Sequence, residues 1–316
     1  MKLFYTCILC ICSFFIYTET RAKDILVVSI APQAYFLKHI VGNTQDVITF
    51  LPRGADPHTF EPSIKILQKV SKARVFFTIG IGLENQWEHR LHAIAPSVEF
   101  VPSYIEQVMT PDIHSHQHSH EEHEHSHHSH DTHDGHNHNS CTPSFKKHSS
   151  GALIPINQHV WTSPRSMQIV IEQMMIKLIE LYPQYTEMYT KNASELMDKM
   201  VVLNEEIQTG LQNKKHRVFI SYHPSWGYFA NEYDLQELVI EENEREPSAK
   251  TMVQLIKTAK EKQARVILTQ PQFPQKSVQT LSKELNTLPI VNIDPLQEDW
   301  FSMMREMKET LEKYLQ

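Results

Sequence analysis

Short apolar runs alternate with longer amphipathic stretches along most of the chain. In the first third the runs are rich in β-branched residues and predict strands at residues 25–31, 46–51, 75–79 and 98–101. Apolar positions three or four residues apart predict helices between them, at residues 32–40, 61–72 and 83–93. Strands and helices that alternate in this way form a parallel sheet covered by helices. The pattern therefore predicts a four-stranded α/β unit.

The same alternation returns in the last third of the chain. Strands are predicted at residues 217–222, 237–240, 266–269 and 289–293. Helices are predicted at residues 248–262 and 275–285, with a closing amphipathic helix at 296–315. The predicted fold class is α/β, with two similar lobes, each a four-stranded and mainly parallel sheet flanked by helices.

A long helical pattern lies between the two lobes, at residues 164–211, with a break at Pro183. A helix of about 20 residues spans about 30 Å, so this segment predicts a rigid connection between the lobes. We therefore divide the mature chain into an N-terminal lobe (23–162), a linking helical region (163–212) and a C-terminal lobe (213–316).

Residues 1–22 have the pattern of a secretory signal peptide. Lys2 precedes an apolar run that is too short for a confident membrane span, and Thr20-Arg21-Ala22 offers a cleavage site. Three of the four cysteines lie in this run without the small-residue context of a lipoprotein, and only Cys141 remains after cleavage. We expect an exported, periplasmic protein with no internal disulfide.

Histidine is concentrated in one polar segment, because 12 of the 20 histidines fall between residues 114 and 138. They are His114, His116, His118, His120, His123, His125, His127, His128, His130, His133, His136 and His138. No apolar face offsets the entropy of ordering this segment, so a disordered loop is expected at about residues 111–150. An auxiliary role in scavenging zinc is favoured over a pH- or zinc-responsive docking loop and over a dispensable insertion.

The charge of the chain argues against one class of binding partner. The formal net charge is −7, and basic residues gather only in brief clusters, as at Lys146-Lys147 and residues 214–217. We therefore expect no nucleic-acid partner.

Four potential metal ligands lie in loops between predicted elements. His58 follows a strand, His159 precedes the Ser163-Pro164 helix start, His223 follows another strand and Asp294 follows the last. Ligands of α/β folds bind at the carboxyl ends of strands, so one cleft can collect these side chains. Three imidazoles and a carboxylate suit tetrahedral Zn²⁺.

These motifs resemble the metal-specific solute-binding proteins of bacterial ABC transporters, in the cluster A-I zinc and manganese group. The resemblance covers the mature chain and includes DPH…EPS, HVW-x-SP, HPSWGYFA, a second EPS at 246–248 and the terminal Asp-Pro. It implies a metal held between two lobes by His58, His159, His223 and Asp294. It also implies a monomer that delivers the metal to an inner-membrane permease.

Zinc is the expected cargo. Manganese-type members usually have Glu at the position of His223, and the histidine-rich loop resembles zinc-uptake members. Asn157-Gln158 replaces the family's usual Asp-Pro, which puts a supporting carboxylate for His159 in doubt. A disulfide found in some zinc-specific members is also missing.

Two alternatives remain open. One is manganese or iron as cargo in the same family, because affinity order alone does not set the metal. The other is a secreted zinc hydrolase, which three histidines and a water molecule can support. Against an enzyme, the His-Glu-x-x-His match at residues 123–127 lies in the histidine-rich segment, which has no apolar face to form a helix, and Asp294 would occupy the position that catalysis keeps open.

Overall fold

The computed structural model of the protein describes residues 22–103, 145–147, 153–155, 158–242 and 245–316. The predicted signal peptide, except for Ala22, lies outside these residues. The 12 histidines between residues 114 and 138, together with Asn157 and Cys141, also lie outside them.

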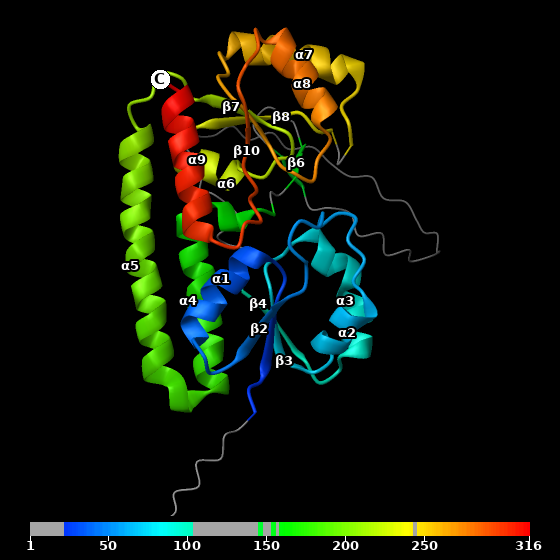
Figure 1. The fold of residues 1–316 in the computed structure, drawn as a ribbon, viewed down its shortest axis with the longest axis vertical. Coiled ribbons are helices and arrows are strands. Elements are labelled where there is room, and N and C mark those ends of the chain that lie inside the picture. The colour runs from blue at the N-terminus through cyan, green and yellow to red at the C-terminus, as the bar shows by residue number, and fades with distance from the viewer. Residues whose placement is uncertain (1–21, 104–144, 148–152, 156–157, 243–244) are drawn as a thin grey trace, which may run out of the picture.

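The first lobe is built on a parallel sheet with the strand order β2-β1-β3-β4. Its strands are β1 (Ile25–Val28), β2 (Asp46–Thr49), β3 (Ala73–Thr78) and β4 (Glu99–Pro102). Its helices are α1 (Ala31–Val41), α2 (Ile64–Val70) and α3 (Gly82–Ile94), with α1 on one side of the sheet and α2 and α3 on the other (Figure 1). Leu26, Val27 and Val28 are fully buried, as expected of a central strand with helices on both faces.

The second lobe repeats this plan. Its parallel sheet has the order β10-β9-β7-β8, which read in reverse matches the order of the first sheet. The strands are β7 (Val218–Ser221), β8 (Gln236–Val239), β9 (Ile267–Thr269) and β10 (Ile290–Asn292). The helices are α6 (Gly227–Glu232), α7 (Ala249–Glu261), α8 (Gln275–Glu284) and α9 (Trp300–Tyr314). The predicted fold class is therefore confirmed.

Two long helices connect the lobes. Helix α4 (Pro164–Leu181) ends before a 3₁₀ turn at Pro183–Tyr185, and α5 (Thr186–Leu211) then returns beside it. Helix α5 runs alongside the first lobe and ends near the level of β7 in the second, with α9 beside its upper half (Figure 1). The predicted break at Pro183 is confirmed. In the described part of the chain, no helix is both long and apolar enough to cross a membrane.

A short antiparallel pair, β5 (Phe145–Lys147) and β6 (Leu153–Pro155), precedes the helical region.

Two predicted helices begin later than expected. Helix α9 begins at Trp300 instead of residue 296, because the Asp299 side chain caps it by accepting from Ser302 N. Helix α2 begins at Ile64 instead of residue 61, because Ser63 is its N-cap and accepts from Ile66 N.

One hydrophobic core runs through both lobes. It contains Val27 from the first sheet, Leu203 from α5, Met307 from α9 and Trp226 from the second lobe. A smaller core, which includes Ile220, lies between the second sheet and helices α7 and α8. Each Å² of apolar surface exposed by separating the lobes would cost about 25 cal/mol. The shared core therefore restricts wide opening.

Two tryptophans join the segment before α4 to the segment before α9. Trp161 Nε1 donates to the carbonyl oxygen of Pro295 at 2.7 Å, and Trp300 Nε1 donates to the carbonyl oxygen of Trp161 at 2.6 Å. Both rings are buried, with exposed fractions of 2% and 0%. We call these two bonds the tryptophan link; they fix the turn after His159 against the chain that follows Asp294.

Replacing Trp300 tests the tryptophan link. Trp300→Phe leaves the buried carbonyl of Trp161 without its donor, which costs about 1–3 kcal/mol beyond the lost ring area. Urea unfolding of the metal-free protein measures this loss. The control is Trp87→Phe in α3, which removes similar ring area outside the link. Equal losses in the two variants would contradict the assigned role of the link.

Candidate metal centre

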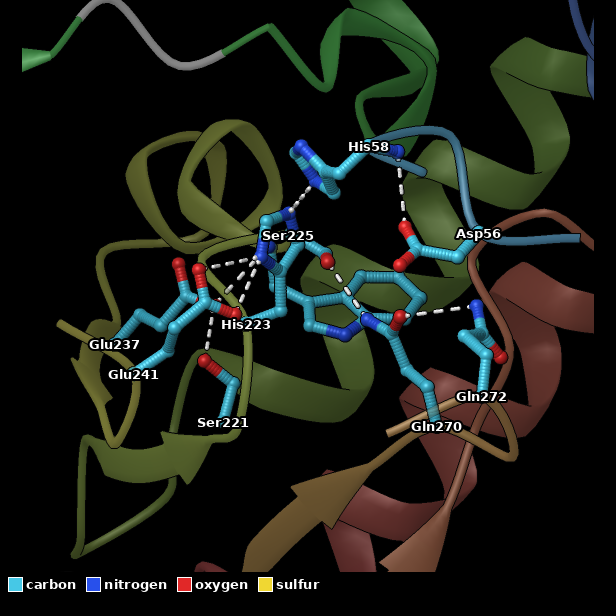
Figure 2. Close-up of polar contacts among 10 residues, drawn as sticks. Asp56, His58, Ser221, His223, Ser225, Glu237, Glu241, Gln270 and Gln272 are labelled. Carbon is cyan, nitrogen blue, oxygen red and sulfur yellow. Dashed lines mark hydrogen bonds and ion pairs between the residues drawn. The ribbon is translucent and has the colours of Figure 1, made fainter. Parts of the chain in front are cut away.

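Three histidines from three different segments meet between the lobes. His58 lies in the loop between β2 and α2, His159 directly precedes the 3₁₀ turn Val160–Thr162, and His223 follows β7. Both His58 and His223 therefore follow the carboxyl end of a parallel strand, one in each lobe. Figure 2 shows the His58 and His223 rings facing each other.

The spacing of these rings suits a metal ion. His58 Nε2 lies 3.4 Å from His223 Nε2, and the His159 ring centroid lies 5.0 Å from that of His223. Tetrahedral zinc with Zn–N bonds of about 2.0–2.1 Å places its nitrogen ligands about 3.3–3.4 Å apart. The two Nε2 atoms are thus separated by the edge length of such a tetrahedron.

A small cavity of about 20 Å³ lies among the three imidazoles. Its other lining residues include Trp161, Phe273, Pro295 and Leu296, which make the wall largely apolar. The Phe273 ring stacks on His223, with centroids 5.3 Å apart and an interplanar angle of 28°. This volume accommodates a single ion or water molecule and excludes larger solutes.

A buried carboxylate contacts the far side of the His223 ring. The two carboxylate oxygens of Glu241 lie 3.0 and 3.2 Å from His223 Nδ1 (Figure 2). The side chains of His223 and Glu241 are only 6% and 7% exposed. Sequence reasoning missed Glu241, although the rule that found His223 applies to it, because Glu241 lies just past the carboxyl end of β8, which pairs with β7.

The surroundings of His159 shift its pKa strongly. Removal of the ring from water lowers the pKa of His159 well below its ordinary value, and the adjacent His223 and His58 lower it further. The ring is therefore neutral at neutral pH. A neutral imidazole is the form that binds a metal.

His159 is held in place by contacts on both sides. Gln158, one of the two residues that depart from the family pattern, accepts from Gly82 N at 2.6 Å. The loop before Gly82 is fixed in turn by Glu84, whose carboxylate accepts from Ile79 N and Gly80 N at 2.7 Å each. On the other side, the tryptophan link holds the following turn. Gln158 thus supports this segment through the backbone without a carboxylate.

Asp294 is not brought together with the histidines. Its Oδ1 accepts from Leu296 N at 2.9 Å, and it does not line the cavity, although Pro295 and Leu296 do. Among the described residues, no three His, Cys, Asp or Glu side chains already form a complete metal-binding group. The predicted histidine-rich ligands lie outside the described residues.

The fold and this site define a class: a two-lobed binding protein with a histidine-lined cavity between its lobes. Residues 26–314 match the family described as zinc-uptake complex component A, periplasmic. The chain belongs to this family, as the resemblance in its motifs implied. Its members are solute-binding transport proteins and not enzymes, so the prediction of a non-enzyme is confirmed and the hydrolase alternative is wrong.

Individual relatives match most of this chain in sequence. The zinc-binding protein AdcA of Streptococcus pyogenes serotype M3 is 28% identical over 319 residues, which cover 94% of this chain and 58% of AdcA. The chain thus spans little more than half the length of this relative. A putative metal-binding protein of Chlamydia muridarum is 24% identical and covers 90% of this chain and 89% of its own length.

Solved structures show the same fold. A crystal structure of ZnuA is 28% identical, with a TM-score of 0.75, and covers 93% of this chain and 100% of its own. A deletion mutant of ZnuA with zinc bound has the same TM-score and identity. A manganese-bound periplasmic metal-binding protein from Candidatus Liberibacter asiaticus has a TM-score of 0.70 at 16% identity, which supports the fold alone.

The buried carboxylate of Glu84 gives a pH-dependent test of the support under His159. Burial raises the pKa of Glu84 above its ordinary value, although bonds from Ser29, Ile79 and Gly80 lower it in part. The folded protein therefore holds this proton more tightly than the unfolded chain does. The resulting stability is complete below the unfolded-state pKa of about 4.3 and is lost as pH rises through the folded-state pKa.

We expect the unfolding free energy of the wild type, relative to Glu84→Gln, to fall as the pH rises above the unfolded-state pKa of about 4.3 and through the raised pKa of the folded protein. Urea unfolding at constant ionic strength measures this difference. Glu88→Gln, at an exposed position on the same helix, is the control. A Glu84→Gln difference that does not change with pH would refute the role of this carboxyl group.

Proposed function

We propose that this protein captures Zn²⁺ in the periplasm and delivers it to the membrane permease of an ABC uptake transporter. In this proposal His58, His159, His223 and Asp294 hold the ion between the lobes. The convergence of three imidazoles from both lobes on one cavity, with two Nε2 atoms 3.4 Å apart, is the observation that carries it. Membership of the zinc-uptake family supports the same cargo and partner.

Zinc is favoured over manganese by ligand chemistry. Imidazole nitrogen suits Zn²⁺, whereas Mn²⁺ prefers carboxylate, carbonyl and water oxygens, and a given nitrogen-oxygen site binds Zn²⁺ more tightly. Manganese or iron stays as the second candidate cargo. An excess of Mn²⁺ that displaces bound zinc would favour it.

Asp294 would complete the proposed ligand set either through Oδ2 or by leaving Leu296 N, from which its Oδ1 now accepts. Pro295 and Leu296 already line the cavity, so only a local rotation of this segment separates the carboxylate from the ion. If Asp294 does not bind, a water molecule takes the fourth position.

The 12 histidines at residues 114–138 form auxiliary zinc sites in this proposal. Their imidazoles alternate with serine and acidic residues and offer many low-affinity arrangements. Scavenging zinc for the cavity is the favoured role, ahead of a docking switch or a dispensable insertion.

Zinc titration of the mature chain tests the cavity. We expect the variant lacking residues 114–138 to keep one tight zinc, and His58→Ala, His159→Ala or His223→Ala to lose it, because each removes one of three nitrogen ligands. Elemental analysis and competition with a chromophoric chelator measure stoichiometry and affinity. Saturation at about 1,000 times the dissociation constant should also stabilise the fold by about 4 kcal/mol, and chelator should reverse this.

His39→Ala is the matched control, because His39 is exposed on α1, away from the cavity. Full zinc retention by His223→Ala would refute the site. Asp294→Asn separates the two options for the fourth ligand, since an unchanged affinity would assign that position to water.

The auxiliary zinc should be more sensitive to acid than the cavity zinc. Loop imidazoles with ordinary pKa values of about 6.5 gain protons near pH 5 and lose their metal affinity. We expect the extra zinc bound by the full mature chain at about pH 7.5 to disappear at about pH 5, as measured by equilibrium dialysis. The variant without residues 114–138 gives the baseline, and an unchanged excess at pH 5 would contradict the assignment.

A further inference from the structure

We propose that Glu241 is a positioning residue for the metal centre, which holds His223 with its Nε2 atom toward the cavity and places a negative charge behind it. This inference deepens the proposed zinc site and rests on it. Neither the motifs of the family nor the histidine pattern of the sequence assigns a role to Glu241.

The contact fixes which nitrogen of His223 is available. A carboxylate only accepts hydrogen bonds, and a neutral imidazole carries its proton on one nitrogen. With both Glu241 oxygens within 3.2 Å of Nδ1, the proton lies on Nδ1. The lone pair then lies on Nε2, the atom that faces His58 at 3.4 Å.

Glu241 is itself held by the sheet. Beyond the ends of β7 and β8 the backbone pairing continues, because Ile240 N donates to Ser221 O at 2.9 Å and Glu241 N donates to Tyr222 O at 3.0 Å. The carboxylate therefore lies on an extension of a rigid strand pair, beside the residue that precedes His223. A group fixed in this way orients a ligand more accurately than one on a flexible loop.

Phe273 completes the restraint on His223. It stacks on the face of the imidazole, whereas Glu241 contacts its edge at Nδ1. Rotation of the His223 ring about χ2 would break the bond to Glu241 and leave that buried carboxylate without this hydrogen-bond partner. The cost of that unpaired charge keeps Nε2 directed toward the cavity.

The two neighbouring glutamates do not take this role. Glu237 Oε1 already accepts from Ser221 Oγ at 2.6 Å and from Trp226 N at 3.1 Å, so it fixes the start of the segment that leads into α6. Glu242 accepts at 2.7 Å from Oγ1 of Thr251, which lies in the first turn of α7. Of the three, Glu241 has the imidazole as its partner.

A carboxylate behind a histidine ligand also affects the metal. It raises the basicity of the imidazole and stabilises a dication in a wall that is otherwise largely apolar. Loss of such a partner weakens metal binding about tenfold to a hundredfold in metalloproteins in general. Glu241 therefore supplies, at His223, the kind of carboxylate support that the Asn157-Gln158 segment does not supply at His159.

Zinc affinity of Glu241 variants tests the inference in the chain lacking residues 114–138. We expect Glu241→Ala to weaken zinc binding about tenfold to a hundredfold and Glu241→Gln to weaken it less, because the amide oxygen still accepts from Nδ1. Glu242→Gln, which removes the same charge at the next residue, should bind zinc as the wild type does.

The imidazole tautomer gives a second readout that does not depend on zinc. Imidazole ¹⁵N chemical shifts of the metal-free protein should show His223 protonated on Nδ1 in the wild type and in Glu241→Gln, and a tautomer mixture in Glu241→Ala. Urea unfolding shows whether each metal-free variant is folded. If Glu241→Ala is not folded, the isosteric Glu241→Gln variant still tests the inference.

Either of two results for Glu241→Ala would overturn the inference alone: a wild-type zinc affinity, or a wild-type His223 tautomer. Absence of tight zinc in the unaltered cavity would instead overturn the proposed function, and this inference with it.

Discussion

The tryptophan link is the constraint on which the site depends. Trp161 and Trp300 each donate an indole N–H to a backbone carbonyl, and the two bonds tie the chain at His159 to the chain at Asp294. Because both rings are buried in the core shared by the two lobes, neither bond can be exchanged for water without exposing apolar surface. The geometry at the cavity is thus a consequence of core packing, and the loops alone do not determine it.

This construction limits how a bound ion can leave. Helix α5 contacts helices on both sides of the cavity, and the larger core continues through it. Wide hinge motion would expose that core, whereas a local shift of the loop with His58 or of the segment with Asp294 exposes little. Neither of those two segments belongs to a helix or a strand, while His223 is fixed by Glu241 and Phe273. Release by local movement of ligand loops is therefore cheaper than separation of the lobes.

Much of this architecture follows from sequence pattern, and the exceptions have physical reasons. Alternating apolar runs predicted both sheets, and Pro183 predicted the break between α4 and α5. The rule that ligands bind at the carboxyl ends of parallel strands predicted that His58 and His223 lie together. That rule says nothing about χ angles, so it does not give the contact of the Asp294 carboxylate with Leu296 N, and Asp294 as a ligand stays a prediction. Helix starts at Ile64 and Trp300 were misplaced because side-chain caps at Ser63 and Asp299 outweigh apolar periodicity. Glu241 was missed because its contact with His223 depends on side-chain conformations, which the sequence pattern does not give.

Charge balance explains why the carboxylates around the cavity matter as much as the imidazoles. Three imidazole ligands bring no negative charge, so they would leave a bound dication uncompensated, and the apolar wall of Trp161 and Phe273 would make an unbalanced charge expensive. Glu241 compensates one positive charge through the ring of His223 without entering the coordination sphere. Asp294 would compensate the other by turning from Leu296 N toward the ion. The segment around Asp294 would then have two states. In the metal-free protein the backbone holds Asp294, and in the loaded protein the ion does. The affinity of the site would depend on the free-energy difference between these states.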